Sequence, residues 1–168
     1  MYIRVLNPAD AGNYREIRLQ SLLDHPEAFL SSYEKEKEMP LEITRSRLEP
    51  AEGRFTLGGF TERDELAGVV TFIRESSGKI RHKGNVYAMY VSPAARNRKL
   101  GYKLMKELIV RAGQLPGLER INLTVFSDND PAKRLYTSLG FSCYGTERKA
   151  VKLDGVYLDE DLMTLELK

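Results

Sequence analysis

The sequence predicts a mixed α/β fold: a central seven-stranded, mostly antiparallel sheet with helices on both faces. Three observations lead to this prediction. Short apolar runs alternate with polar turns through the first half of the chain. A strand, an amphipathic helix and a second strand follow one another over residues 85–126, which indicates one right-handed parallel β-α-β crossover. Two apolar runs joined by Asp154-Gly155 then close the chain as a hairpin.

Bulk composition narrows the class of protein. We expect residues 1–168 to form one domain, and an apolar fraction of 42% is enough for its core. The single cysteine, Cys143, excludes an internal disulfide and favours a reducing compartment, so we expect a cytoplasmic protein with Cys143 buried. No apolar run reaches the ~18 residues of a membrane span. The net charge of +2 gives no reason to expect a nucleic-acid partner.

The first half of the chain combines one clear helix with several strands. Asn7 is a good N-cap and Pro8 suits the first helical position, so a helix is expected from there to His25-Pro26. Residues 27–50 are polar, with a second short helix expected after Pro40. Period-two patterns predict strands over residues 2–6, 54–60, 66–74 and 85–91.

The second half changes period. Apolar residues from Leu100 to Ala112 recur at the spacing of one buried helix face, and Pro116-Gly117 ends that helix. Residues 120–126 have strong β propensity. We expect Asp130 to cap a short helix that Pro131 opens and Gly140 ends in the left-handed conformation. Strands are expected over residues 141–153 and 156–167.

A basic loop precedes the long apolar helix. It holds Arg96, Asn97, Arg98, Lys99 and Gly101. A helix N-terminus has unpaired N–H groups and a positive dipole end, and glycine allows close approach, so this loop can hold a pyrophosphate. A solvated basic turn that merely connects two elements is the alternative interpretation.

Two segments carry a family resemblance. VSPAARNRKLG (residues 91–101) resembles the coenzyme A-binding motif of the GNAT superfamily of acetyl-CoA-dependent N-acetyltransferases. Arg96 and Gly101 match this motif, whereas Asn97 and Lys99 stand where the family usually has glycine. NDPAKRLYTSLGF (residues 129–141) resembles the family's Asn-x-x-Ala-x-x-Leu-Tyr-x-x-x-Gly-Phe motif without a departure. The order of expected elements agrees over nearly the whole chain.

The resemblance implies an enzyme that transfers an acetyl group from acetyl-CoA, without a metal, to a primary amine by direct attack in a ternary complex. The acceptor would be a small molecule or a protein N-terminus or lysine. The Val91 N–H would polarise the thioester carbonyl, Asn129 would bind the pantetheine arm, and Tyr136 would protonate the departing thiolate. The implied coenzyme-binding residues are Met89, Tyr90, Val91, Arg96, Asn97, Arg98, Lys99, Leu100, Gly101, Tyr102, Asn129, Lys133 and Tyr136.

The acceptor side is less defined. Phe29, Ser31, Tyr33 and Glu34 lie in the segment that often lines the acceptor site in relatives, and Glu34 is a hypothesis for the general base. The Glu-Lys run that begins at Glu34 is also typical of a solvated helix face.

Tyr136 also has an alternative interpretation. Outside its motif, an aromatic residue on the inner face of a helix would be interpreted as part of the core.

The sequence gives little support to other kinds of catalytic or metal site. Cys143 has no nearby histidine in the sequence to activate it, and His25 and His82 match no metal-ligand spacing. A non-catalytic coenzyme A-binding or sensor module is the main alternative, supported by Lys99 at a glycine position. Nucleic-acid binding through the basic loop is a third, weaker hypothesis. The oligomeric state stays open, a homodimer included.

Overall fold

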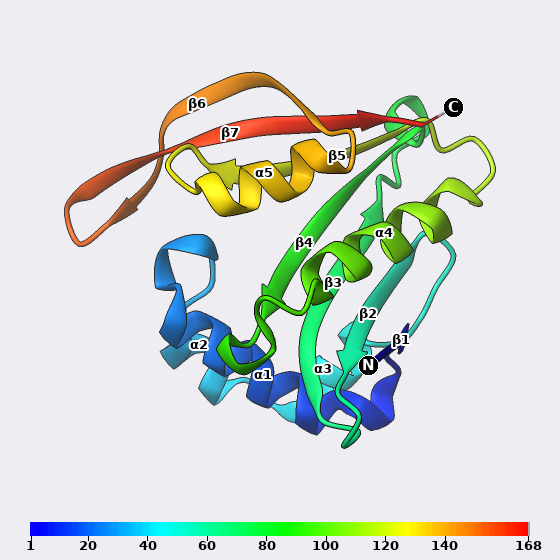
Figure 1. The fold of residues 1–168 in the computed structure, drawn as a ribbon, viewed down its shortest axis with the longest axis vertical. Helices are drawn as coiled ribbons and strands as arrows, with labels where there is room; N and C mark the ends of the chain where they lie inside the picture. Colours follow the sequence, from blue (N-terminus) through cyan, green and yellow to red (C-terminus); the bar gives the residue numbers. More distant parts are fainter. Residues whose placement is uncertain (168) are drawn as a thin grey trace.

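The computed structural model describes residues 1–167 and contains one seven-stranded sheet in the order β1-β2-β3-β4-β5-β7-β6 (Figure 1). All neighbouring strands pair antiparallel except β4 and β5, which pair parallel. The predicted fold class is therefore confirmed. The strands are β1 (Tyr2–Val5), β2 (Arg54–Phe60), β3 (Leu66–Arg74), β4 (Lys83–Val91), β5 (Arg120–Phe126), β6 (Ser142–Leu153) and β7 (Val156–Glu166).

Helices cover both faces of the sheet (Figure 1). On one face α1 packs on β3 and on α3, and α2 packs against α1. On the other face α4 packs across β2, β3 and β4. The α-helices are α1 (Ala11–Asp24), α2 (Tyr33–Glu38), α3 (Leu41–Arg47), α4 (Leu100–Gly113) and α5 (Asp130–Ser138). No helix within residues 1–167 combines the length and the apolar character needed to cross a membrane.

Strand alternation divides the core into two clusters. The larger lies under α4 and α5 and includes Phe72, Leu104 and Ile121. The smaller lies under α1 and α3 and includes Phe60 and Tyr90. Successive side chains on a strand point to opposite faces, so β4 sends residues into both clusters. This two-sided burial fixes the register of the central strands.

Local signals explain where several elements begin and end. Asn7 caps a 3₁₀ turn (Pro8–Asp10) that leads into α1, and Asp10 completes the capping box. The turn at Asp154-Gly155 has positive φ at both residues, as a tight hairpin requires. Gly140 has φ of +96°, as predicted. The cap of α5 differs from the prediction: Asn129, not Asp130, caps this helix, and its Oδ1 accepts from the Ala132 N–H at 3.2 Å.

Other expectations also need correction. Cys143 is exposed rather than buried, because it lies on β6, the edge strand of the sheet; its Sγ donates to the Gly145 carbonyl at 3.3 Å. Strand β4 begins at Lys83, two residues before the predicted start, because Lys83 and Gly84 pair with β5. A turn signal such as Lys-Gly does not exclude a strand where the glycine fills a crowded position.

Gly84 provides a test of this packing. A Cβ at Gly84 would overlap the ring of Phe72, which is fully buried and cannot move aside. We expect Gly84→Ala to lower the free energy of unfolding by about 1–3 kcal/mol, measured by urea denaturation. Gly78→Ala is the control, because nothing lies within 4 Å of its Cβ position. Equal stability of the two variants would contradict the register of β4.

Candidate active site

The two parallel strands separate along their length. β4 and β5 pair only at Lys83–Arg120, Gly84–Ile121 and Asn85–Asn122. Beyond these pairs β4 continues to Val91 and β5 to Phe126 without further pairing to each other (Figure 1). The split leaves a wedge between the two strands, and backbone N–H and C=O groups of both strands face it. These groups need hydrogen-bond partners other than each other. Beyond the wedge, β4 leads into the loop before α4, and β5 leads into the loop before α5.

A bulge in β4 lies within this unpaired half. Ala88 has φ of +54°, and the pairing of β3 with β4 shifts register between Val69 and Thr71. A bulge changes which face each later side chain reaches. Met89 and Val91 therefore pack beneath α4, whereas Tyr90 enters the cluster under α1.

The side chain of Tyr90 is held away from the wedge. Its hydroxyl donates to Asp24 Oδ2 at 2.5 Å, and Gln20 donates to the other oxygen of Asp24 at 2.6 Å. Burial and this carboxylate raise the pKa of Tyr90, and the hydrogen bond lowers the pKa of Asp24. Only the backbone of Tyr90 can serve a ligand in the wedge.

Two residues of the basic loop have a left-handed backbone conformation. Asn97 and Lys99, which replace family glycines, have φ of +63° and +58°. Asparagine tolerates this left-handed conformation, and at lysine it costs on the order of 1 kcal/mol. The Lys99 side chain is exposed, so it does not fill the loop. No side chain caps α4, which leaves the N–H groups of its first turn available to an anion.

The predicted loop residues contribute in different ways. Arg96 is exposed, and its Nε donates to the Val91 carbonyl at 3.3 Å while its Nη2 lies 3.0 Å from His25 Nε2. Arg98 and Tyr102 are also exposed. Leu100 is buried in the core, so only its backbone can meet a ligand.

Gly101 lies where a backbone approaches neighbouring side chains closely. A Cβ there would lie 3.2 Å from Met89 Cε and 3.5 Å from Leu135 Cδ2. The uncapped helix start, the left-handed turns and the basic side chains together suit a diphosphate. The residues present therefore fit the pyrophosphate of coenzyme A.

An ion pair connects helix α5 to strand β7. Lys133 Nζ lies 2.6 Å from Asp161 Oδ2 and donates to the Ser127 carbonyl at 3.0 Å. Asp161 also accepts from the Ser127 and Thr146 hydroxyls. Lys133 and these hydroxyls lower the pKa of Asp161 to about 2. Lys133, predicted to bind coenzyme, thus already has a partner, whereas Asn129 uses only its carbonyl oxygen as a cap.

Tyr136 lies on the inner face of α5 and is only 7% exposed. Its ring packs edge-on against Phe141 at 6.0 Å between centroids, and burial raises its pKa to about 12. Within residues 1–167 the side-chain polar atoms that are both sealed and unpartnered belong to Arg18 and Arg54, so the Tyr136 hydroxyl is not one of them. The ring is therefore part of the core, and its hydroxyl is not fully sealed from solvent.

A groove with a volume of about 660 Å³ lies between the segment after α1 and the β6–β7 hairpin. Its lining is mostly apolar and contains all four residues predicted for the acceptor. The lining residues are Leu22, Leu23, Pro26, Phe29, Leu30, Ser31, Ser32, Tyr33, Glu34, Ala150, Val151, Lys152, Leu153 and Asp154.

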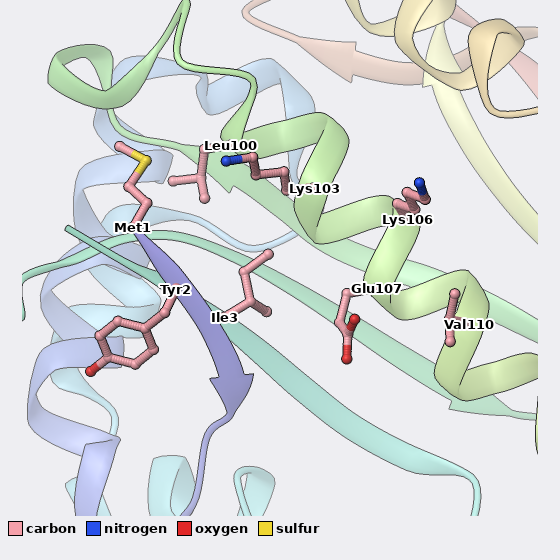
Figure 2. A pocket seen from close by; sticks show the side chains of 8 residues that line it. All are labelled: Met1, Tyr2, Ile3, Leu100, Lys103, Lys106, Glu107 and Val110. Atoms are coloured by element: carbon pink, nitrogen blue, oxygen red, sulfur yellow. The ribbon is translucent and has the colours of Figure 1, made fainter. Parts of the chain in front are cut away.

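A second hollow, of about 380 Å³, lies between β1 and α4 (Figure 2). Figure 2 shows the side chains of Leu100, Lys103 and Glu107 coming from α4. Tyr2 and Ile3 come from β1, and Met1 directly precedes this strand. Strand β1 is three strands from β4 in the sheet, so this hollow is separate from the wedge. Leu100 is the one predicted site residue in its lining.

A family model described as the acetyltransferase (GNAT) family matches residues 19–141. The chain belongs to this family. The resemblance drawn from the two sequence motifs is thereby confirmed. A curated relative, an L-amino acid N-acetyltransferase from Escherichia coli (strain K12), is 36% identical over 73 residues, which are 44% of this chain and 45% of the relative. The chain spans less than half the length of the curated relatives that it matches.

Solved GNAT structures share the fold over the whole chain. A GNAT acetyltransferase from Streptococcus pneumoniae has a TM-score of 0.86 at 23% identity, with 99% of both chains covered. An acetyltransferase from Salmonella typhimurium, solved with its cofactor acetyl-CoA, has a TM-score of 0.82 at 26% identity, with 100% of this chain and 94% of that chain covered.

Sequence reasoning missed several residues of this GNAT site. The sequence assigned no metal-ligand spacing to His25, which contacts Arg96 in the structure, and Asp24 holds Tyr90. These contacts join positions about 70 residues apart, so no local pattern could have indicated them. Within residues 1–167 no group of three or more His, Cys, Asp or Glu side chains is arranged to bind a metal ion.

The depressed pKa of Asp161 makes the anchoring of α5 dependent on pH. The carboxyl titrates at about 2 in the folded protein and near ~3.9 in the unfolded chain. Its stabilisation is therefore complete above pH ~4 and is lost as the pH falls through 2. We expect Asp161→Asn to be less stable than the wild type at pH 7, and the gap to narrow steadily below pH ~4. Urea denaturation of both proteins, repeated from pH 7 down to pH 2, measures this difference in stability. Asp128→Asn, at an exposed position, is the control. A gap independent of pH would contradict the ion pair.

Proposed function

We propose that this GNAT protein transfers an acetyl group from acetyl-CoA to a primary amine by direct attack in a ternary complex. One observation supports this proposal most. The split between β4 and β5 leads to the uncapped start of α4, and Tyr136 from α5 belongs to the same core cluster as Met89 and Val91 of β4. We infer from this arrangement that the thioester of acetyl-CoA lies between β4 and β5, with Tyr136 as its acid.

Acetyl-CoA supplies an acetyl group activated as a thioester. The loop from Arg96 to Gly101 binds the pyrophosphate through backbone N–H groups and basic side chains. The free amide N–H₂ of Asn129 donates to the pantetheine arm. The Val91 N–H donates to the thioester carbonyl and stabilises the negative charge that develops on its oxygen.

Tyr136 acts as the general acid. The amine nitrogen bonds to the acetyl carbon, the carbon–sulfur bond breaks, and the Tyr136 hydroxyl donates its proton to the departing sulfur. The pKa of Tyr136, raised by burial to about 12, lies well above neutral pH, so the phenol carries the proton that an acid needs. A proton leaves the amine to a base or to water, and Glu34 is our candidate for that base because it lies in the groove lining.

The groove between the α1–α2 segment and the β6–β7 hairpin binds the acceptor, with Phe29, Ser31, Tyr33 and Glu34 in contact with it. The Escherichia coli relative is named for L-amino acid acceptors, and these are primary amines small enough for such a groove.

A non-catalytic coenzyme A-binding module is less well supported. The observation in favour of such a module is that Lys99 stands where the family usually has glycine. Lys99 adopts the backbone conformation that glycine would adopt there, and its side chain is exposed. The substitution therefore gives no reason to expect a disabled loop.

A panel of amines tests the proposal. Amino acids, polyamines, aminoglycosides and short peptides are incubated with the protein and acetyl-CoA, and release of the coenzyme thiol is followed. We expect turnover with at least one class. Binding of coenzyme A by calorimetry without turnover on any amine would support the non-catalytic module instead.

The role of Tyr136 is tested by Tyr136→Phe. Removing the acid is expected to lower kcat by about 100-fold or more, while the Kd for acetyl-CoA stays within about twofold. Tyr144→Phe, on the exposed part of β6, is the matched control and keeps wild-type turnover. An unchanged kcat in Tyr136→Phe would leave the ring with a packing role only.

A further inference from the structure

A chain of contacts joins the end of α1 to the end of β4. His25 directly follows α1, and its Nε2 lies 3.0 Å from Arg96 Nη2. The other ring nitrogen of His25, Nδ1, lies 3.4 Å from Glu27 Oε1. Arg96 Nε in turn donates to the Val91 carbonyl at 3.3 Å. The contacts therefore run from the segment after α1, through the basic loop, to the last residue of β4.

The backbone of Val91 faces the wedge. In an antiparallel pair of strands, opposite residues alternate between hydrogen-bonded and non-hydrogen-bonded pairs. The Ser92 N–H donates to the Ala67 carbonyl at 2.9 Å, which makes these two a hydrogen-bonded pair. The adjacent pair, Gly68 and Val91, is then non-hydrogen-bonded. The N–H and the carbonyl of Val91 therefore point away from β3, toward the side where β5 has separated from β4.

Arg96 satisfies one of these two groups. Its Nε–H takes the Val91 carbonyl, which leaves the Val91 N–H for the thioester. Arg96 is exposed, and a long exposed side chain loses rotamer freedom when it is held in one position. Within residues 1–167 Arg96 forms no ion pair with a carboxylate, so its contacts with Val91 and His25 orient the guanidinium.

Only one form of His25 can accept a hydrogen bond from Arg96. A guanidinium has donors and no acceptor, so Nε2 must be the ring nitrogen without a proton. The proton of the neutral imidazole is then on Nδ1, which faces the Glu27 carboxylate. Glu27 and Arg96 thus select the same tautomer of His25 from opposite sides of the ring.

We propose that His25 is a positioning residue for the acetyl transfer: it holds Arg96 on the Val91 carbonyl and so keeps the Val91 N–H aimed at the thioester. The inference rests on the proposed function. The hydrogen bond between Asp24 and Tyr90 fixes the preceding residue of β4, so the end of α1 orients two consecutive residues of this strand. A displacement of about 1 Å can cost on the order of 100-fold in rate. Loss of His25 therefore lowers turnover more than it lowers coenzyme binding.

A kinetic comparison separates this role from a purely structural one. His25→Leu is expected to lower kcat at saturating acetyl-CoA about tenfold, with the amine that the panel identifies. The Kd for coenzyme A, measured by calorimetry, stays within about threefold, because the N–H groups at the start of α4 are unchanged. His25→Gln keeps an acceptor for Arg96 and is expected to recover at least about half of the wild-type kcat.

Two further variants complete the comparison. His82→Leu is the matched control and keeps wild-type turnover, because His82, the other histidine of the chain, directly precedes β4 at the end opposite Val91. In a protein that already has Arg96→Met, His25→Leu is expected to change kcat less than about twofold, since its partner is absent. A tenfold loss in both backgrounds, or equal losses in His25→Leu and His25→Gln, would overturn the inference while the acetyltransferase proposal stands.

The tautomer of His25 gives a readout that needs no turnover and no variant. Nitrogen NMR of the ring at mildly alkaline pH is expected to show the proton on Nδ1 in the wild type. A wild-type ring with its proton on Nε2 would overturn the inference alone, and this measurement decides it if His25→Leu does not fold. Absence of turnover on every amine would overturn both the inference and the proposed function.

Discussion

The rest of the site depends on the split between two parallel strands. β4 and β5 share only three residue pairs and then separate, although both continue for several residues. Unpaired backbone groups in a sheet are costly, so such a split persists only where the surrounding structure enforces it. Here the bulge at Ala88 redirects β4, the Asp24–Tyr90 hydrogen bond holds it toward α1, and the Lys133–Asp161 ion pair holds α5 against β7 on the other side.

The sequence predicted the fold because its local signals agree with one another. Apolar periodicity indicated the strands and the long helix α4, and the Asp154-Gly155 turn indicated the closing hairpin. The predictions are wrong where contacts between distant parts of the chain determine the local structure. Asn129 rather than Asp130 caps α5, since both residue types are good caps and only the path of the chain selects between them. Exposure of Cys143 follows from its place on an edge strand, which composition does not reveal.

Sequence motifs contain more of the proposed coenzyme site than of the proposed acceptor groove. The residues of the proposed coenzyme site are consecutive in the chain, in the loop before α4 and at the start of α5, so motifs can contain them. The acceptor groove combines residues near Phe29 with residues near Val151, and the two parts meet only through the fold. His25 lies in no motif, and its contact with Arg96 appears only in three dimensions.

The composition of the groove walls has a consequence for how the protein can change over evolutionary time. Both walls come from peripheral segments, the stretch after α1 and the tip of the last hairpin. The large core cluster and the loop proposed to bind phosphate lie elsewhere. Substitutions or length changes in these walls alter what fits between them at small cost to stability. A lineage built on this scaffold can therefore exchange its acceptors while inheriting the donor chemistry intact.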